Sequence, residues 1–306
     1  MLDRLTLDQL RVLLAVAEEG SFSAAARKLG RVQSAISQSV QTLEDVLQVQ
    51  LFSREGKVPT LTEAGRVLLA DARNLVRGAD TMRTRAEGIA TDVEPELTIA
   101  VDPIFPNAVL MESLQRLSEE FPCLPVTLFT EGLGGPEQRL RDGTVRLAIY
   151  TLLSTGAEDL DSEFLTSIPM IPVVAASHKL AREPGPLSRA TLEQHLQLVL
   201  TDRTPLSNHI RGGIVSLRVW RFADLGARLE YLLGGFGWCF MPAHLVEPHI
   251  AAGRLVRLTL QQQSIFDFQV SVVRERGRTP GRAGRWLVDD LRKRLDGKFG
   301  SEQAPK

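Results

Sequence analysis

The chain of 306 residues is 43% hydrophobic and 24% charged, and its 36 Lys and Arg against 37 Asp and Glu leave a formal net charge of -1. This composition excludes a disordered chain, and the length predicts two or three folded units. The balanced charge also excludes a protein that attracts nucleic acid or an acidic membrane through its overall field, so any nucleic-acid site has to be local.

The sequence gives no targeting, membrane or metal signal. Residues 1–20 carry acidic side chains inside their apolar stretch and lack a cleavage site of small residues, so they do not predict an export signal. No stretch approaches the roughly 18 apolar residues of a membrane span, and we expect a cytoplasmic protein. Cys123 and Cys239 lack the spacing of a metal site or a CxxC redox motif and are expected to be buried. We predict no metal ion and no cofactor.

Residues 1–60 predict short helices followed by a hairpin. In the first helix the apolar stripe is formed by Leu7, Leu10, Leu14 and Ala17. Between residues 49 and 62, extended pieces around the turn Glu55-Gly56-Lys57 predict a wing.

Two further helices of this segment form a helix-turn-helix pattern. Ser21 is a typical N-cap for a helix over 22–29, which Gly30 can end, and a third helix is expected over about 33–47. Ala26, Gly30 and Ile36 stand where the motif needs a small contact residue, a turn glycine and a branched core residue. Two unrelated packed helices would give a similar short match. We predict a winged helix-turn-helix domain over residues 1–60.

A heptad repeat follows. Large and small residues each recur every seven positions, in two registers: Leu61, Leu68, Leu75, Met82 and Ile89, and Gly65, Ala72, Ala79 and Ala86. Such a seam lets two helices approach closely, so residues 61–91 predict a linker helix that dimerises. The alternative is an amphipathic helix packed on its own domain.

Residues 92–296 alternate predicted strands and helices and indicate two α/β lobes on a mostly parallel sheet. FLTSI and MIPVVAAS are predicted as separate strands on either side of Pro169. Periodicity does not settle whether the last strand, FQVSVVRE, and the last helix, 280–295, return to the first lobe. Residues 297–306 are a predicted flexible tail, and the fold class is a multidomain α+β protein.

The stretch LDQLRVLLAVAEEGSFSAAARKLGRVQSAISQSVQTLEDVLQVQLFSREGKVPTLTEAG resembles the LysR-type transcriptional regulators without a gap. The resemblance implies a winged helix-turn-helix, a linker-helix dimer, an effector domain of two lobes like those of periplasmic binding proteins, and in most members a homotetramer. One departure is Gln48, where the family commonly has Gly. A non-Gly residue takes the left-handed conformation at a cost, so the end of the third helix is expected to differ slightly.

The third helix presents polar residues that suit base reading. Gln can bond adenine in pairs and Ser can bond base edges or phosphates, whereas no Arg or Lys lies between Val32 and Asp45 to read guanine. Cations at the turn and the wing can neutralise phosphates, or can be solvated surface charges. The predicted DNA-contacting residues are Ser23, Arg27, Lys28, Arg31, Gln33, Ser34, Ser37, Gln38, Gln41, Arg54 and Lys57.

Strand ends of the two lobes are expected to line an effector site, as the resemblance implies. The predicted effector-binding residues are Asp102, Pro103, Ile104, Thr130, Glu131, Thr151, Thr201, Asp202, Arg203 and Phe222. Family members often carry Ser or Thr where this chain has Asp102. A buried carboxylate there disfavours a simple organic acid unless Arg203 or another cation compensates, and favours an amine-bearing or mostly apolar ligand. Alternatively, Asp102 caps the following helix.

We therefore predict a sequence-specific transcriptional regulator, not an enzyme, whose partners are double-stranded DNA, a small-molecule effector and further copies of itself. The alternatives are an enzymatic or a solute-binding α/β protein with an accessory helical domain. The five histidines accompany no GxSxG or HExxH pattern, which disfavours an enzyme. A solute-binding protein would need an export signal and has no use for residues 1–90.

Overall fold

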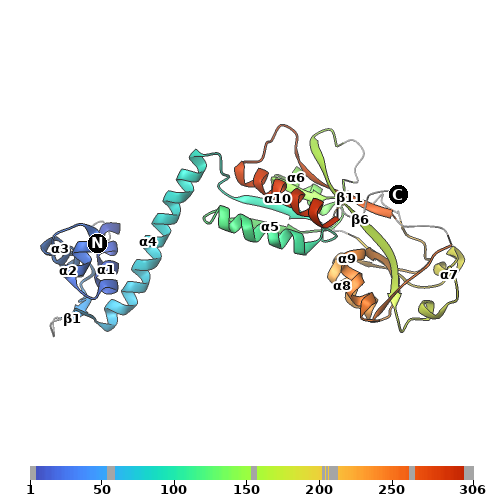
Figure 1. Cartoon of the computed structure of the whole chain (residues 1–306), viewed down its shortest axis with the longest axis horizontal. Coiled ribbons are helices and arrows are strands. Elements are labelled where there is room, and N and C mark those ends of the chain that lie inside the picture. The colour runs from blue at the N-terminus through green and yellow to red at the C-terminus, as the bar shows by residue number, and fades with distance from the viewer. Residues whose placement is uncertain are drawn as a thin grey trace. The chain divides into compact units, whose positions relative to one another are not determined.

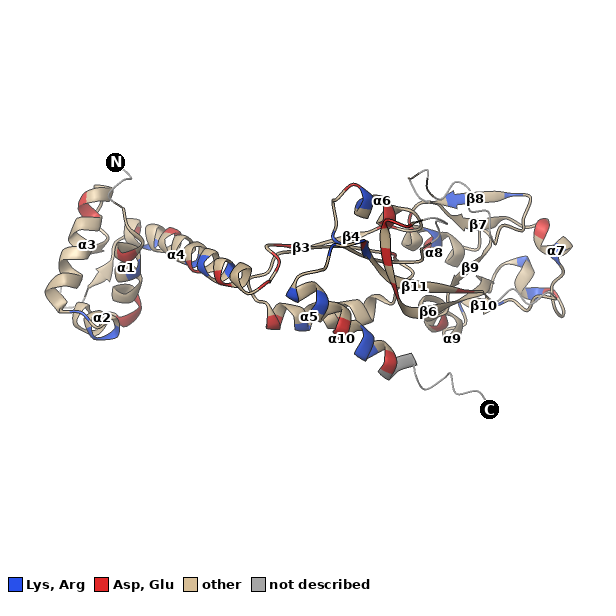
Figure 2. Cartoon of the chain, turned by 90° about the horizontal axis from the view of Figure 1, so that it is seen from above, with Lys and Arg blue, Asp and Glu red and all other residues tan. Residues whose placement is uncertain are grey.

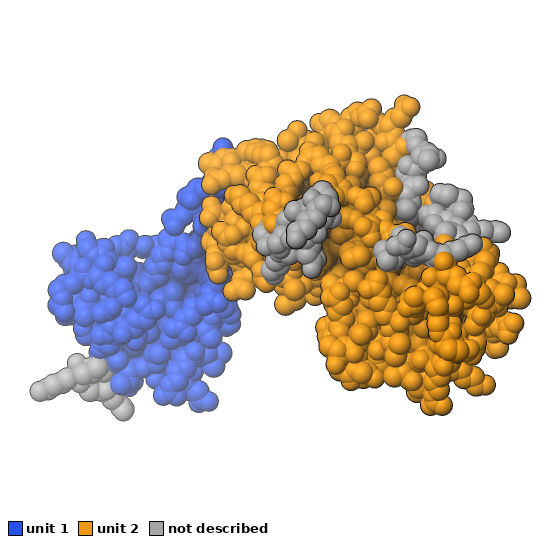
Figure 3. All heavy atoms as spheres, turned by 45° about the vertical axis from the view of Figure 1, so that its right-hand side comes forward, with its two compact units in different colours: residues 1–90 blue, residues 91–306 orange. Residues whose placement is uncertain are grey.

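A computed structural model describes residues 5–53, 59–152, 157–201, 204, 206, 213–261 and 266–299. The chain divides into two compact units, which Figure 3 colours separately: unit 1, Met1–Ala90, and unit 2, Thr91–Lys306. Among the described residues, no helix combines the length and the apolar composition that crossing a membrane requires.

Unit 1 contains a helical head and one long helix. Its elements are α1 (Leu7–Glu19), α2 (Phe22–Leu29), α3 (Gln33–Leu47), β1 (Phe52–Ser53), β2 (Thr60–Leu61) and α4 (Glu63–Ala90) (Figure 1). Ser21 Oγ accepts the backbone N–H of Ala24, and Gly30 follows α2 at a φ of 64°. The second and third helices therefore begin and end where the sequence predicts. β1 and β2 pair antiparallel, while Arg54 and Lys57 of the predicted wing lie outside the described residues.

The three short helices share one core with the start of α4. Ala26 and Ile36 are buried in it, as the helix-turn-helix pattern predicts. The stripe predicted for α1 is wrong in detail, because Leu7 is 41% exposed. The buried residues of α1 are instead Leu10, Val12, Leu13, Ala15 and Val16. Since α1 contacts α2, α3 and α4, it buries a wider face than one stripe provides.

The heptad residues of α4 change their surroundings along the helix. Leu68 packs against the head core, as does Leu61 just before the helix. Leu75, Met82 and Ile89 are 53%, 75% and 56% exposed. The start of α4 thus belongs to the head, while from Leu75 onward the helix carries an apolar row that no described residue of unit 1 covers.

Unit 2 is built on one sheet with the strand order β4-β3-β5-β11-β6-β9-β7-β8, and β10 pairs with β6. The first lobe contains β3 (Leu97–Val101), α5 (Asn107–Glu120), β4 (Val126–Thr130), α6 (Gly135–Arg141), β5 (Leu147–Tyr150) and α10 (Arg282–Phe299). The second lobe contains η2 (Lys179–Arg182), α7 (Arg189–Glu193), β7 (Gln197–Leu200), β8 (Val219–Phe222), α8 (Leu225–Leu233), β9 (Trp238–Pro242), α9 (Ala243–Ala251) and β10 (Leu255–Arg257). The strands β6 (Leu160–Ala175) and β11 (Phe266–Glu275) join the lobes.

The sheet is mixed, which corrects the expectation of a mostly parallel one. β3 is parallel to β4 and β5, and β7 is parallel to β8 and β9, but β6 and β11 pair antiparallel with their neighbours. The two strands predicted around Pro169 are one strand, β6, which pairs with β11 on both sides of that residue. Proline removes one N–H donor, and the long antiparallel ladder continues past it.

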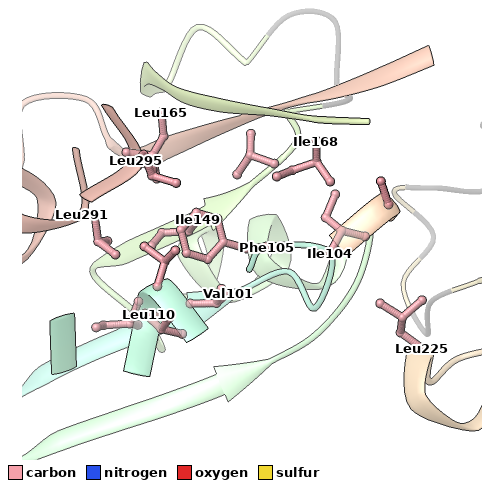
Figure 4. Packing of buried hydrophobic residues seen from close by; sticks show 14 of the residues in the cluster. Val101, Ile104, Phe105, Leu110, Ile149, Leu165, Ile168, Leu225, Leu291 and Leu295 are labelled. Atoms are coloured by element: carbon pink, nitrogen blue, oxygen red, sulfur yellow. The ribbon is translucent and has the colours of Figure 1, made fainter. Parts of the chain in front are cut away.

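The last strand and helix return to the first lobe, which the sequence left open. β11 pairs with β5, and α10 lies beside α5 (Figure 1). Their apolar residues join the main core, where Val101, Phe105 and Ile149 cluster with Leu291 and Leu295 of α10 (Figure 4).

Candidate functional site

The exposed face of α3 is polar and uncharged over its first turns. Gln33, Ser34, Ser37 and Gln38 are exposed, and the helix contains no Lys or Arg, so Figure 2 shows it tan over most of its length. The Ser23 hydroxyl of α2 donates to Oε1 of Gln33 at 2.9 Å, which orients that amide. Residues at this spacing share one helix face. The face can offer paired amide bonds to adenine and hydroxyl contacts, but no bidentate arginine contact to guanine.

Gln41, the last predicted reader, differs from the others. It is half-buried, and its Nε2 donates to the Asp45 carboxylate at 2.9 Å. A contact with a base would have to replace this bond, so Gln41 is less available than Gln38.

The cations at the turn are not equivalent. Lys28 pairs with Glu18 and Glu19 at 3.1 and 2.9 Å, and hydrogen bonding to these carboxylates raises the pKa of Lys28. Arg31 donates two hydrogen bonds to Asp8, at 2.7 and 2.8 Å, and thereby lowers the pKa of the Asp8 carboxyl.

Arg27 is exposed and has no ion pair with any residue that the structure describes. Its guanidinium therefore keeps its full charge available for a phosphate, whereas Lys28 and Arg31 would have to exchange acidic partners.

Sequence reasoning missed two apolar groups beside the readers. Val32, the residue that precedes α3, is 68% exposed, and Ala35 is exposed on the same turn as Ser34. Small apolar groups at a recognition helix can contact the methyl group of thymine. Only Val32 gave a signal, as an apolar residue at a helix start where a polar cap is usual.

Gln48 keeps the left-handed conformation that glycine would favour. Its φ is 56° and its ψ is 33°, and its backbone N–H bonds to the carbonyl of Glu44. Its Nε2 donates to the carbonyl of Asp45 at 2.6 Å. Gln48 therefore ends α3 in the left-handed conformation, which puts strain on one residue.

A cavity of about 270 Å³ lies between the lobes of unit 2. Its polar wall residues are Asp102, Thr151, Gln197 and Arg228, and most of the remaining wall is apolar. The cavity is close in size to sites that take small organic molecules, which start at roughly 300 Å³.

Asp102 is buried in the wall of this cavity. One carboxylate oxygen accepts the N–H of Ile104 at 2.9 Å, and the other accepts the N–H of Leu133 at 3.0 Å. Burial raises the pKa of Asp102 to about 6, against the lowering effect of these bonds and of Arg228. Because the residue before α5 is Pro106, the alternative that Asp102 caps this helix is wrong.

Arg228 was not singled out from the sequence, where it looks like a surface residue of an ordinary helix. The structure buries it in the cavity wall at 5% exposure. The sequence analysis allowed that a cation other than Arg203 compensates the charge of Asp102, and Arg228 is such a cation.

Of the predicted effector-binding residues, the cavity wall contains Asp102, Ile104 and Thr151. Residues outside this wall are Pro103, Thr130, Glu131, Thr201 and Phe222. Glu131 pairs with Arg139 at 2.5 Å, and the ring of Phe222 packs on Tyr231 at 5.1 Å in an outer groove. Asp202 and Arg203 lie outside the described residues.

Both units match known protein families. Residues 90–296 match the family described as LysR substrate binding domain, and residues 7–66 match the bacterial regulatory helix-turn-helix proteins of the lysR family. The chain is similar to the probable HTH-type transcriptional regulator YhaJ of Escherichia coli (strain K12), with 32% identity over 96% of this chain and 98% of that protein. It is also similar to the HTH-type transcriptional regulator AceR of Acinetobacter baumannii, with 31% identity over 93% of this chain and 96% of that one.

Among solved structures, the OxyR C206 mutant of Corynebacterium glutamicum has a similar fold. It aligns with a TM-score of 0.61 at 24% identity and covers 95% of this chain and 93% of that chain.

Proposed function

This chain belongs to the LysR family of DNA-binding transcriptional regulators, and we propose that it reads its operator with the exposed face of α3, binds a small effector in the cavity of unit 2 and acts as a homo-oligomer. Its relatives are named as transcriptional regulators, so the enzymatic and solute-binding alternatives are set aside. With a role on DNA, we propose a cytoplasmic location.

The observation that carries the DNA proposal is the uncharged polar face of α3. Base contacts come from Gln33, Ser34, Ser37 and Gln38, which are exposed together on this face. Phosphate contacts come first from Arg27, whose charge is available. Because amides pair with adenine and no arginine lies on α3, the operator half-site is A·T-rich where the helix meets it.

The test is binding of the full chain to a fragment of its own upstream DNA. The double variant Gln33→Ala and Ser37→Ala is expected to lose specific binding and to keep the affinity of the wild type for scrambled DNA. Helix content and oligomeric state serve as controls of folding. Unchanged specific binding by the variant would contradict reading by α3.

Effector control follows from the position of the cavity between two lobes. A ligand that contacts both lobes stabilises one arrangement of them, and this shift can change the spacing of the heads in the oligomer and the bending of DNA. The expected result is a change in footprint length or bend angle with ligand. A ligand that binds and changes neither would exclude this mechanism.

Two exposed apolar surfaces support oligomerisation. The first is the row of Leu75, Met82 and Ile89 on α4, which suits a helix dimer. The second is a cluster of aromatic rings beside the edge strand β8, where Trp220, Tyr231 and Phe236 are 44%, 42% and 50% exposed. Surfaces of this kind mark interaction sites.

Substitutions in the two surfaces are expected to give different oligomeric states. Met82→Glu is expected to break the helix dimer, and Trp220→Ala is expected to reduce a tetramer to dimers. Sedimentation of the two variants beside the wild type distinguishes these outcomes. A wild-type chain that stays monomeric at micromolar concentration would contradict both assignments.

A further inference from the structure

The cavity of unit 2 holds a cation whose hydrogen bonding is incomplete. Arg228 is 5% exposed, and its Nη2 donates to the carbonyl oxygen of Phe240 and to the sulfur of Met241, each at 3.1 Å. Its Nε is buried and has no partner among the described residues. A buried guanidinium without an anionic partner is costly, and an acid that meets Arg228 in the cavity wall recovers part of this cost.

The nearest acid in the wall does not meet this need. Asp102 forms no ion pair with Arg228, and its two carboxylate oxygens accept the backbone N–H groups of Ile104 and Leu133. Arg228 and Asp102 face the same cavity from different lobes, since α8 supplies the former and the end of β3 the latter. The guanidinium thus lacks a carboxylate in contact with it.

The rest of the wall suits a ring. Phe240, Phe266 and Phe268 line the cavity in succession, with ring centroids 5.0 and 5.5 Å apart, and Met170 lies in the same wall. A dry cavity of about 150 Å³ holds benzene, so about 270 Å³ leaves room for one substituted ring.

We infer that the cavity, acting as the effector site proposed above, takes a ring-bearing organic acid whose single anionic head lies on Arg228 and whose ring lies against the three phenylalanines. Arg228 is then the residue that sets specificity for the head group, because a charge-assisted bond to an acid is stronger than a bond to a neutral acceptor. An ammonium head meets the guanidinium as a like charge and is disfavoured.

A second anion in the cavity has a consequence for Asp102. Arg228 is the charged residue that shares the described wall with it, and the ligand acid approaches this same cation. Since burial already raises the pKa of Asp102 to about 6, an incoming anion raises it further, and the complex takes up a proton near pH 7. Arg228 is a cation of the kind for which the sequence analysis allows an organic acid in this site.

The test uses the full chain with benzoate, phenylacetate and cyclohexanecarboxylate, each beside its amide and its amine. Titration calorimetry is expected to show the acids binding most tightly, the amides more weakly and the amines at least about tenfold more weakly than the acids. In buffers of different ionisation enthalpy, acid binding at pH 7 is expected to be accompanied by net proton uptake. Tighter binding of the amines, or no binding of any acid, would overturn the inference.

Two variants separate the head-group role from general stability. Arg228→Met is expected to lower acid affinity about 10- to 100-fold and to remove the preference for acid over amide, because the cation that meets the acid is gone. Arg228→Gln is the second variant if the first fails to fold. Arg274→Met, which changes an arginine outside the cavity, is the matched control and should bind acids as the wild type does. Equal acid binding by Arg228→Met and the wild type would overturn the assignment.

Two further outcomes distinguish failure of the proposed regulatory function from failure of the head-group assignment. Acids that bind through Arg228 but leave DNA affinity, footprint and bending unchanged would keep the head-group assignment and remove the regulatory role of the cavity. A change in DNA binding that appears only with amines would keep the regulatory role and remove the head-group assignment.

Discussion

The head of unit 1 and the cavity of unit 2 hold their charges in opposite surroundings. Lys28 and Arg31 lie in water beside acidic partners, whereas Arg228 and Asp102 are 5% and 3% exposed and do not pair with each other. Salt screens a surface charge, and water replaces its partner at little cost. A buried charge depends on the few groups around it. Salt is therefore the sensitive probe of the head, and pH is the sensitive probe of the cavity.

The largest expected effect is on the pH dependence of stability in unit 2. Burial raises the pKa of Asp102 from 3.8 to about 6, so the folded state holds this proton more tightly than the unfolded state. The contribution of Asp102 to the free energy of unfolding is fully present below about pH 4 and is lost as the pH rises from about 4 to about 6. A shift of this size corresponds to about 3 kcal/mol. Asp102→Asn is expected to remove this fall.

Denaturant unfolding followed by tryptophan fluorescence measures this effect in the full chain. All three tryptophans, Trp220, Trp238 and Trp286, belong to unit 2, so the signal reports that unit alone. The pKa values of Glu163 and Asp290 are lowered, so the stability that these carboxylates contribute is lost as the pH falls. The quantity to compare is therefore the difference in unfolding free energy between Asp102→Asn and the wild type at each pH. Parallel pH profiles of the two proteins would refute a buried, proton-binding Asp102.

The next effect is the contrast between two neighbouring cations of α2. Arg27→Ala is expected to weaken DNA binding several-fold and to reduce the slope of log affinity against log salt by about 1, because one phosphate contact is lost. Lys28→Ala is expected to change both less, since Glu18 and Glu19 already neutralise this side chain. Fluorescence anisotropy over a salt series compares them. Equal losses in the two variants would break the distinction between paired and unpaired cations.

The smallest expected effect is at the end of α3. Gln48→Gly is expected to stabilise the head by about 0.5–1 kcal/mol, because glycine adopts a φ of 56° without strain and this gain exceeds its extra freedom in the unfolded chain. Gln48→Ala keeps the strain and loses the bond to Asp45, so it should destabilise the head. Circular dichroism at the unfolding transition of unit 1 is the measurement. A glycine variant less stable than the wild type would mean that the side-chain bond outweighs the strain.

Sequence reasoning succeeded where the determinants are local. The cap Ser21, the turn Gly30 and the uncharged run from Gln33 to Gln41 follow one another along the chain, so the helices and the exposed face of α3 could be predicted. It failed where residues distant in sequence meet. The ion pair of Arg31 with Asp8 joins the turn after α2 to the start of α1, and Arg228 lies in the cavity wall because α8 packs on β6, β7 and β8.

The width of the buried face of α1 could not be predicted from the sequence either. The run of apolar residues in α1 fits several stripes equally well, and contacts with three other helices decide which residues are buried. Pro169 indicated a break between two strands, but the pairing of β6 with β11 carries the strand across it. In both cases a tertiary contact overrides a local pattern.

The most direct test of DNA reading by an uncharged helix is the salt dependence of binding by the double variant Gln33→Ala and Gln38→Ala. Affinity of the variant and the wild type is measured on upstream DNA and on scrambled DNA over the same salt series. The expected result is a loss of specific affinity with an unchanged slope, and no change on scrambled DNA, because amides contact bases and carry no charge. Unchanged specific affinity, or a slope that falls as if a phosphate contact were lost, would contradict reading by the amides of α3.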